Sequence, residues 1–341
     1  MKDRPVQPSR ATIIDIAKAA GISYSSVSRA LNGLKGVSED TRRKVRDIAE
    51  GMGYFPNAVA QGLVRRRTGT LGLIIPDITN PFYPELALGV EERASREGLC
   101  TFLCNTDYDP KKEKTYIKTL LEKQVDGIIL APISGTANLF EERHNMPLPC
   151  VYLGNAPENT KYSYVVTDNV RGGYLAARTL IEKGYRRIGF VSGSEGGSAV
   201  DERHSGFVEA MRRYDLPVRE DDVRREDWRL QSGHEIVSRM IDSKDHPEAL
   251  IAGNDLLALG IILGIREKGL KVPDDMAVIG FDDIPTASFP GIDLSTIRQP
   301  KIRMGEAAVE IILDLIASGD GGDKSPRRVI MDPELVLRST C

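Results

Sequence analysis

Short apolar runs alternate with amphipathic helical stretches from Thr70 to the C-terminus, and this alternation restricts the possible folds more than any other feature of the chain. Regular strand–helix alternation is typical of parallel sheets covered by helices on both faces. Residues 70–341 are too many for one sheet of ordinary width, so we expect two doubly wound α/β lobes that bind ligands beyond the carboxyl ends of their strands. The expected strands are 71–75, 101–105, 127–131, 150–153, 164–167, 187–191, 249–252 and 276–280, and the expected helices are 84–97, 110–123, 170–183, 201–214, 254–268 and 302–318.

The first 55 residues follow a different pattern, which predicts three short helices at 12–20, 24–31 and 38–52. Thr12 and Ser23 can cap the first two helices, and Gly21 can end the first one in a left-handed turn. Two helices joined by such a short glycine-containing turn form a helix-turn-helix. Helical spacing alone fits an ordinary three-helix packing unit equally well.

The distribution of charge favours a nucleic-acid partner for this head. Residues 1–68 hold 13 lysines and arginines against six acidic residues, a net charge of +7, which leaves −10 for the remainder because the whole chain carries −3. A basic head on an acidic body is typical of DNA-binding proteins.

Several other classes lack their sequence signals. The N-terminus has no apolar stretch resembling a secretory signal and no apolar run is long enough to span a bilayer, so we expect a cytoplasmic protein without a membrane partner. The four cysteines form no CxxC pair and the four histidines no HExxH, so no metal and no cofactor are expected. Neither a nucleophile elbow nor a GxGxxG loop follows a strand, which argues against an enzyme.

Motifs along nearly the whole chain resemble those of the bacterial lactose/galactose repressor family, in the family's order. They read ATIIDIAKAAGISYSSVSRALNG, VSEDTRRKV, GMGYFPNAVAQGL, TGTLGLIIPDITNPFYPELALGVEE, VDGIIL, TDNVRGGYLAARTLIEKGYRRIGFVSG, GNDLLALG, VPDDMAVIGFDD and STIRQP. The resemblance implies an all-α helix-turn-helix domain (1–55), a hinge helix and linker (56–69), and a two-lobed domain like the periplasmic binding proteins (70–341). It implies one lobe of about 70–168 plus 300–325, and another of about 169–299 plus 326–341.

The resemblance also implies which residues contact DNA. In the family the second helix enters the major groove, where Tyr24, Ser25 and Arg29 match base-reading positions and Ser26 and Ser28 lie nearby. Arginine can bond guanine through two N–H groups, and serine can contact phosphates or bases. Thr12, Asn32 and Tyr54 match positions that contact the DNA backbone. Leu63 matches a hinge leucine that wedges into the minor groove at the operator's centre.

In the cleft between the lobes, the family's effector-binding positions correspond to Phe82, Asp168, Arg203, Trp228, Asn254 and Asp282, with Tyr83 and Gln299 as further candidates. Carboxylates, amides and arginine bind hydroxyl groups, and an aromatic face stacks on a sugar ring, so the expected effector is a sugar. Purine-binding members use an arginine and a threonine where this chain has Gly197 and Ala199, which disfavours a purine.

The resemblance therefore predicts a transcription repressor that binds a palindromic operator as a homodimer and is controlled allosterically by a small molecule. One alternative is a corepressor-type regulator that responds to a non-sugar metabolite or to a protein partner. Another is a sugar-binding protein without a DNA function. The basic head and the missing export signal argue against the latter.

Overall fold

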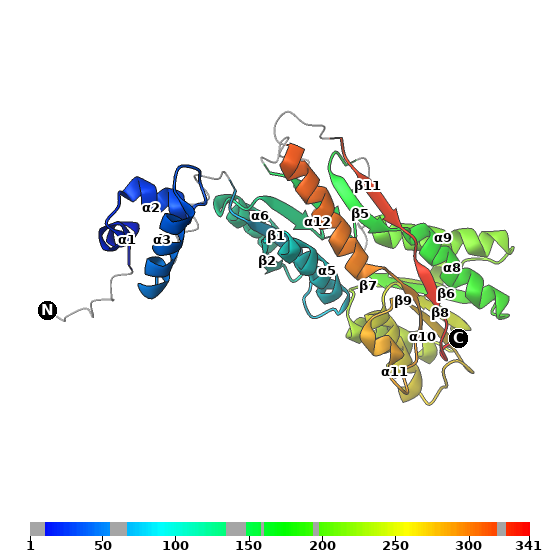
Figure 1. Cartoon of the computed structure of the whole chain (residues 1–341). Helices are drawn as coiled ribbons and strands as arrows, with labels where there is room; N and C mark the ends of the chain where they lie inside the picture. Colours follow the sequence, from blue (N-terminus) through cyan, green and yellow to red (C-terminus); the bar gives the residue numbers. More distant parts are fainter. Residues whose placement is uncertain (1–10, 55–66, 134–147, 158–159, 194–197, 319–324) are drawn as a thin grey trace. The chain divides into compact units, whose positions relative to one another are not determined.

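A computed structural model describes residues 11–54, 67–133, 148–157, 160–193, 198–318 and 325–341 (Figure 1). The chain divides into two compact units, residues 1–68 and residues 69–341. No helix within these described ranges is long and apolar enough to cross a membrane.

Within residues 11–54, the described part of the N-terminal unit contains three helices, α1 (Ile13–Ala20), α2 (Tyr24–Leu31) and α3 (Glu39–Gly51). At the start of α1, Thr12 Oγ1 accepts the Asp15 N–H (3.3 Å) while the Asp15 carboxylate accepts the Thr12 N–H (2.9 Å), which is a capping box. Gly21 ends α1 with φ 68°, a left-handed conformation that glycine adopts without strain. The core of this unit consists of Ile16, Ala20, Val27, Ala30, Val45 and Ala49.

The larger unit contains two six-stranded sheets, each the centre of one lobe. The sheet of the first lobe has the strand order β11-β5-β4-β3-β1-β2, and all of its pairings are parallel. Its strands are β1 (Thr70–Ile75), β2 (Cys100–Asn105), β3 (Gly127–Leu130), β4 (Cys150–Leu153), β5 (Ser163–Thr167) and β11 (Arg328–Met331). The helices α5 (Phe82–Arg96) and α12 (Lys301–Ser318) cover one face, and α6 (Pro110–Glu122) covers the other.

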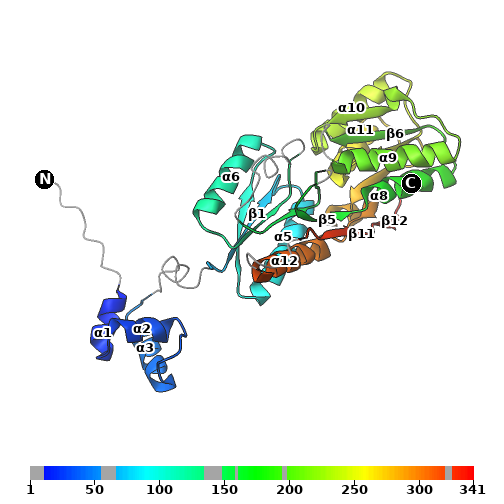
Figure 2. The same cartoon turned by 90° about the horizontal axis from the view of Figure 1, so that it is seen from above.

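The second lobe repeats this arrangement with the strand order β12-β10-β9-β8-β6-β7. Its strands are β6 (Ile188–Gly193), β7 (Val223–Glu226), β8 (Ala249–Ala252), β9 (Ala277–Asp282), β10 (Ser295–Arg298) and β12 (Glu334–Val336). The helices α8 (Asn169–Glu182) and α9 (Ser198–Arg213) lie side by side on one face, and α10 (Leu230–Asp242) and α11 (Asp255–Glu267) pack on the other (Figure 2). Two short 3-10 helices, η1 (Glu220–Asp222) and η2 (Pro285–Ser288), complete it. The α/β class with two doubly wound lobes is confirmed, although β12 pairs antiparallel with β10.

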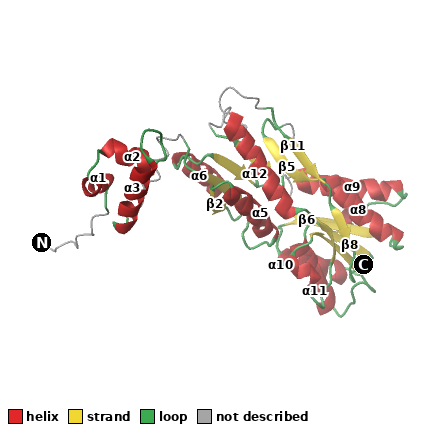
Figure 3. Cartoon of the chain, in the orientation of Figure 1, coloured by secondary structure: helices red, strands yellow, loops and turns green. Residues whose placement is uncertain are grey.

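Figure 3 shows strands of the second lobe between α8 and α9 on one side and α10 and α11 on the other. The chain passes between the lobes three times, after β5, after β10 and after β11. The first two crossings lie near residues 168 and 300. The expected boundary at residue 326 is wrong, because β11 pairs with β5 and residues 328–331 therefore belong to the first lobe. The third crossing lies between Met331 and Glu334.

Candidate functional site

The exposed side of α2 presents the residues that the resemblance assigns to base reading. Tyr24 is 57% exposed, and Ser25 and Arg29 are exposed as well. They lie on the exposed side because Val27 and Ala30 anchor the opposite side of the helix in the core. The Ser25 hydroxyl also lies 2.9 Å from that of Ser23.

Other expected DNA contacts are partly used inside the protein. The hydroxyl of Ser26 lies 2.9 Å from that of Ser23 in the cap of α2. Asn32 donates from Nδ2 to the carbonyl oxygen of Ser28 (2.9 Å). Tyr54 packs against the core, and Leu63 lies outside the described residues. Thr12 is exposed, but its hydroxyl is held by Asp15 at 2.6 Å.

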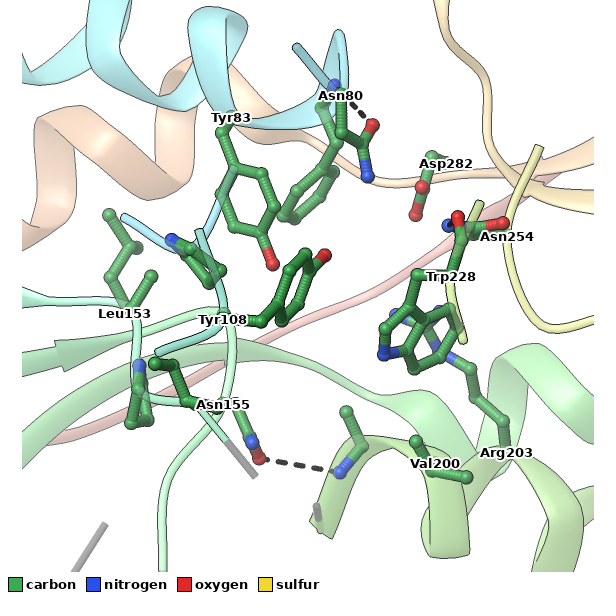
Figure 4. Close-up of a pocket in the computed structure, with 17 residues that line it drawn as sticks. Asn80, Tyr83, Tyr108, Leu153, Asn155, Val200, Arg203, Trp228, Asn254 and Asp282 are labelled. Atoms are coloured by element: carbon green, nitrogen blue, oxygen red, sulfur yellow. Dashed lines mark hydrogen bonds between the residues drawn. The ribbon is translucent and has the colours of Figure 1, made fainter. Parts of the chain in front are cut away.

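A pocket lies between the two lobes, at the carboxyl ends of their strands (Figure 4). Its empty space is about 650 Å³, the open mouth included, which is in the range of small-molecule sites. It is lined by Pro76, Asn80, Phe82, Tyr83, Tyr108, Ala131, Pro132, Ile133, Leu153, Gly154, Asn155, Ala199, Val200, Arg203, Trp228, Asn254 and Asp282.

Arg203 and Asp282 are the charged residues among these lining side chains. Arg203, on α9, is 7% exposed and donates to Asn169 Oδ1 (2.9 Å) and to the carbonyl oxygen of Gly253, with its guanidinium group 3.7 Å from the centre of the Phe281 ring. Burial lowers the pKa of Arg203, and the charge of Asp282 opposes this effect. Opposite charges on the wall leave the pocket close to neutral.

Asp282 ends β9 and is 4% exposed. Burial raises the pKa of its carboxyl group to about 6, while Arg203, Lys301 and a hydrogen bond from Gln299 Nε2 (2.7 Å) lower it. A carboxylate with such partners still has acceptor sites for ligand hydroxyl groups.

Aromatic side chains supply the apolar part of the pocket. Trp228 lies flat against two glycines, since a Cβ atom on Gly193 would come within 2.1 Å of its ring and one on Gly253 within 3.2 Å. From the other lobe come Tyr83 and Tyr108, and burial raises the pKa of both phenols above the ordinary value. Figure 4 shows Tyr108 and Trp228 on opposite sides of the pocket.

The structure brings six of the eight expected effector residues into this pocket: Phe82, Tyr83, Arg203, Trp228, Asn254 and Asp282. Asp168 does not reach it. Its carboxylate caps α8 by accepting the Arg171 N–H (2.8 Å) and lines a separate recess. Gln299 lies behind the pocket, 2% exposed, between Asp282 and Thr167.

Three polar residues of the pocket, Asn80, Tyr108 and Asn155, were missed by sequence reasoning. Asn80 follows β1, and its Oδ1 accepts the Phe82 N–H (3.1 Å). Tyr108 follows β2 in a turn where it and Asp107 both have φ 54°, a left-handed conformation that is uncommon outside glycine. Asn155 follows β4, and its Oδ1 accepts hydrogen bonds from the Ser198 hydroxyl and the Ala199 N–H (3.4 Å) at the start of α9. All three follow the carboxyl end of a strand, and this signal was available in the sequence.

Among the residues that the structure describes, no three histidine, cysteine or acidic side chains lie in a group that could hold a metal ion. The chemistry of the pocket is that of hydrogen bonding and stacking. It offers two opposite charges, amide groups and aromatic faces.

Comparison with known proteins points to the same class. A model of bacterial regulatory proteins of the lacI family matches residues 12–57, and a model of periplasmic binding protein-like domains matches residues 177–341. The chain is 37% identical over 332 residues to the HTH-type transcriptional regulator DegA of Bacillus subtilis, covering 96% of this chain and 97% of that protein. It is 35% identical to the HTH-type transcriptional repressor PurR of Actinobacillus pleuropneumoniae, covering 96% and 97%.

Solved structures agree with these relatives. The lac repressor dimer bound to operator and the anti-inducer ONPF matches with a TM-score of 0.85 at 26% identity, covering 97% of this chain and 99% of that one. The transcriptional regulator CelR in complex with cellobiose matches with a TM-score of 0.72 at 29% identity, covering 97% and 100%.

A helix-turn-helix unit joined to a two-lobed ligand-binding domain defines a transcription regulator and not an enzyme. The chain belongs to the lacI family of bacterial regulatory proteins. The family predicted from the sequence is thereby confirmed.

Proposed function

We propose that this regulator represses transcription by binding a palindromic operator as a homodimer, and that a neutral sugar in the interlobe pocket changes its affinity for DNA. It acts in the cytoplasm, where its DNA is. The observation that carries the effector proposal is the balanced pair of Arg203 and Asp282 beside the indole of Trp228.

The DNA-binding part of the proposal rests on α2. Tyr24, Ser25 and Arg29 are exposed on a helix with two turns of polar surface, which suits entry into the major groove. We further propose that residues 56–69 form a hinge and that Leu63 wedges into the minor groove.

The homodimer is supported by large apolar side chains that stay exposed on both lobes. On the first lobe Leu88 of α5 and Phe102 and Leu103 of the edge strand β2 are each 46% exposed. On the second lobe Leu263 of α11 is 45% exposed and Phe289, next to η2, is 52% exposed. An exposed edge strand that carries apolar side chains favours association with another chain.

A sugar suits the pocket better than a charged metabolite. Since Arg203 and Asp282 offset each other, a phosphate or carboxylate group would lack an unpaired cation on the described walls. Hydroxyl groups can bond to both charged side chains and to Asn254, and a ring can stack on Trp228. CelR with cellobiose and a lacI-family regulator from Enterococcus faecium with bound ribose are neighbours of this fold.

A purine is the second candidate, because several relatives carry the name PurR. A planar base could also stack on Trp228. Against it, Ala199 stands where purine-binding members are expected to have a threonine, and it offers no side-chain hydrogen bond.

Fluorescence of Trp228, the only tryptophan, tests the effector proposal during titration with sugars, sugar phosphates and purines. One neutral sugar is expected to give a saturable change. Asp282→Asn should weaken that binding about tenfold or more, because a charged acceptor for hydroxyl groups is lost. Asp168→Asn is the matched control, since this side chain caps α8 outside the pocket and asparagine caps equally well. A response to purines alone would reject the sugar, and equal losses in both variants would reject the assignment of the pocket.

A further inference from the structure

Lys301 occupies a position that is unfavourable for a lysine on two counts. It is the first residue of α12, where the positive end of the helix dipole disfavours a cation. Its side chain is only 4% exposed, and lysines are almost never buried unless they are paired. Specific contacts must therefore offset both penalties.

The ammonium group of Lys301 meets three acceptors. Nζ donates to the carbonyl oxygens of Asp282 and Asp283, both at 2.7 Å, and pairs with Glu85 Oε2 at 3.3 Å. A lysine has three N–H donors, so each donor has an acceptor. Because α5 and α12 belong to the first lobe and β9 to the second, this one side chain links the two lobes.

The loop held by Lys301 contains a wall residue of the pocket. Asp282 and Asp283 have φ 118° and 52°, values that non-glycine residues rarely adopt and that surrounding contacts must maintain. The Asp283 carboxylate pairs with Arg298 and Arg338, both at 2.7 Å, while Lys301 holds both carbonyl groups. Lys301 is therefore one of the contacts that hold the loop in the conformation that turns the Asp282 side chain toward the pocket.

On the first-lobe side, Lys301 belongs to α12, which packs closely against α5. A Cβ atom on Gly89 would lie 2.1 Å from the carbonyl oxygen of Ile302, so the backbones of α5 and α12 are in direct contact. Glu85 lies within one turn of Phe82 and Tyr83, which line the pocket. Lys301 thus connects the two opposite walls of the pocket from behind.

We propose that Lys301 is a positioning residue, an interlobe staple that holds the Asp282 loop in its ligand-facing conformation and ties it to α5. A ligand that moves one wall then moves the other. This role in the response to an effector rests on the proposed function, whereas the staple itself exists without ligand.

Hydrogen exchange followed by mass spectrometry tests the staple in the full-length protein without any ligand. In Lys301→Met, the backbone amide hydrogens of segments 82–90 and 279–284 are both expected to exchange at least about tenfold faster than in the wild type. Lys118→Met is the matched control, because Lys118 is an exposed lysine on α6 that pairs with Glu122. If Lys301→Met does not fold, Glu85→Gln removes one partner only, and the same two segments should loosen to a smaller extent.

A second measurement separates positioning of Asp282 from a general loss of packing. The charged or titratable groups that face Asp282 are Arg203 from α9, Lys301 from α12, Glu85 and Tyr83 from α5, Asp255 from α11, Asp283 beside it and Tyr108 from the loop after β2. Lys301 favours the ionised form of Asp282, so its removal should lower the urea midpoint more at pH 7.5, where Asp282 is ionised, than at pH 5.

The proposed role of Lys301 would be overturned if amide exchange became faster in only one of the two segments. It would also be overturned if the urea midpoint fell equally at pH 7.5 and pH 5. Faster exchange in both segments together with the pH dependence supports it. If these effects appear in a protein that binds none of the sugars, the staple stands and the proposed effector class is wrong. The two failures are therefore distinguishable.

Discussion

At Asp282, the protonation state that favours the stability of the fold differs from the one that favours ligand binding. Its carboxyl group is almost fully buried, and burial raises its pKa to about 6 from the ordinary value of 3.8. The folded protein therefore prefers the neutral form, which predominates in it below about pH 6. Stability is highest below pH 4 and falls as the pH rises from about 4 to about 6, because over this range the unfolded state releases a proton that the folded state keeps; above pH 6 the folded state must hold a buried charge. Binding of hydroxyl groups is favoured by that same charge.

Asp282→Asn is accordingly expected to make the protein more stable at neutral pH, by on the order of 2 kcal/mol, while it weakens ligand binding. The amide keeps an oxygen for Gln299 and removes the buried charge. The gain in the free energy of unfolding should be nearly the same at pH 7.5 and pH 6, and it should be clearly smaller at pH 4.5, because it is lost between the folded pKa of about 6 and the unfolded pKa of 3.8. Urea unfolding at these three values measures it. A difference that does not change with pH would contradict the assigned pKa.

The residues of the pocket show how far sequence reasoning reaches at this scale. Trp228 and Asp282 were predicted because the resemblance identifies them, and both line the pocket. Asp168 and Gln299 were assigned by the same reasoning, but a motif does not reveal whether a polar side chain faces the cleft or bonds to its own backbone. Tyr108 follows a predicted strand, but the turn that places its side chain in the pocket contains two consecutive left-handed residues, and no local pattern in the sequence predicts that turn.

At the scale of elements, helices were easier to predict than strands. Thr12 and Gly21 predict the two ends of α1, and Ser23 predicts the start of α2. The structure confirms these three positions. Four strands were missed: β7, β10, β11 and β12. Of these, β7 and β11 contain arginines and are partly exposed, so they lack the continuous apolar run that buried parallel strands have. Edge strands of this kind depend on pairing partners that are distant in the sequence.

The hinge is the element for which the sequence offers a sharp test. Leu63→Ala is expected to leave the fold intact but to weaken operator binding several-fold or more, since an apolar wedge that opens a base step is lost. Fluorescence anisotropy of a labelled operator at matched salt measures the affinity, and circular dichroism checks the fold. Equal affinities of the two proteins would rule out the wedge.

At the scale of the whole molecule, the two-lobed architecture follows from the alternating pattern, but its connections do not. Three crossings join the lobes, and the third depends on β11 pairing with β5, more than 160 residues earlier in the chain. Such long-range pairing leaves no local signal. The three crossings, together with Lys301, are the physical links through which a ligand between the lobes can change the larger unit as a whole.

The central claim, that this chain is a sequence-specific DNA-binding regulator, is tested most directly by DNA binding itself. A palindromic duplex selected from genomic DNA is titrated with wild type and with Arg29→Ala at two salt concentrations, and anisotropy is the readout. We predict that wild type binds this duplex far more tightly than a scrambled one, with an affinity that falls steeply with salt. Arg29→Ala should lose about tenfold or more of the preference for the selected duplex, as expected for a side chain that bonds a base edge. Equal binding of the selected and scrambled duplexes by wild type, or an unchanged preference in Arg29→Ala, would contradict the account.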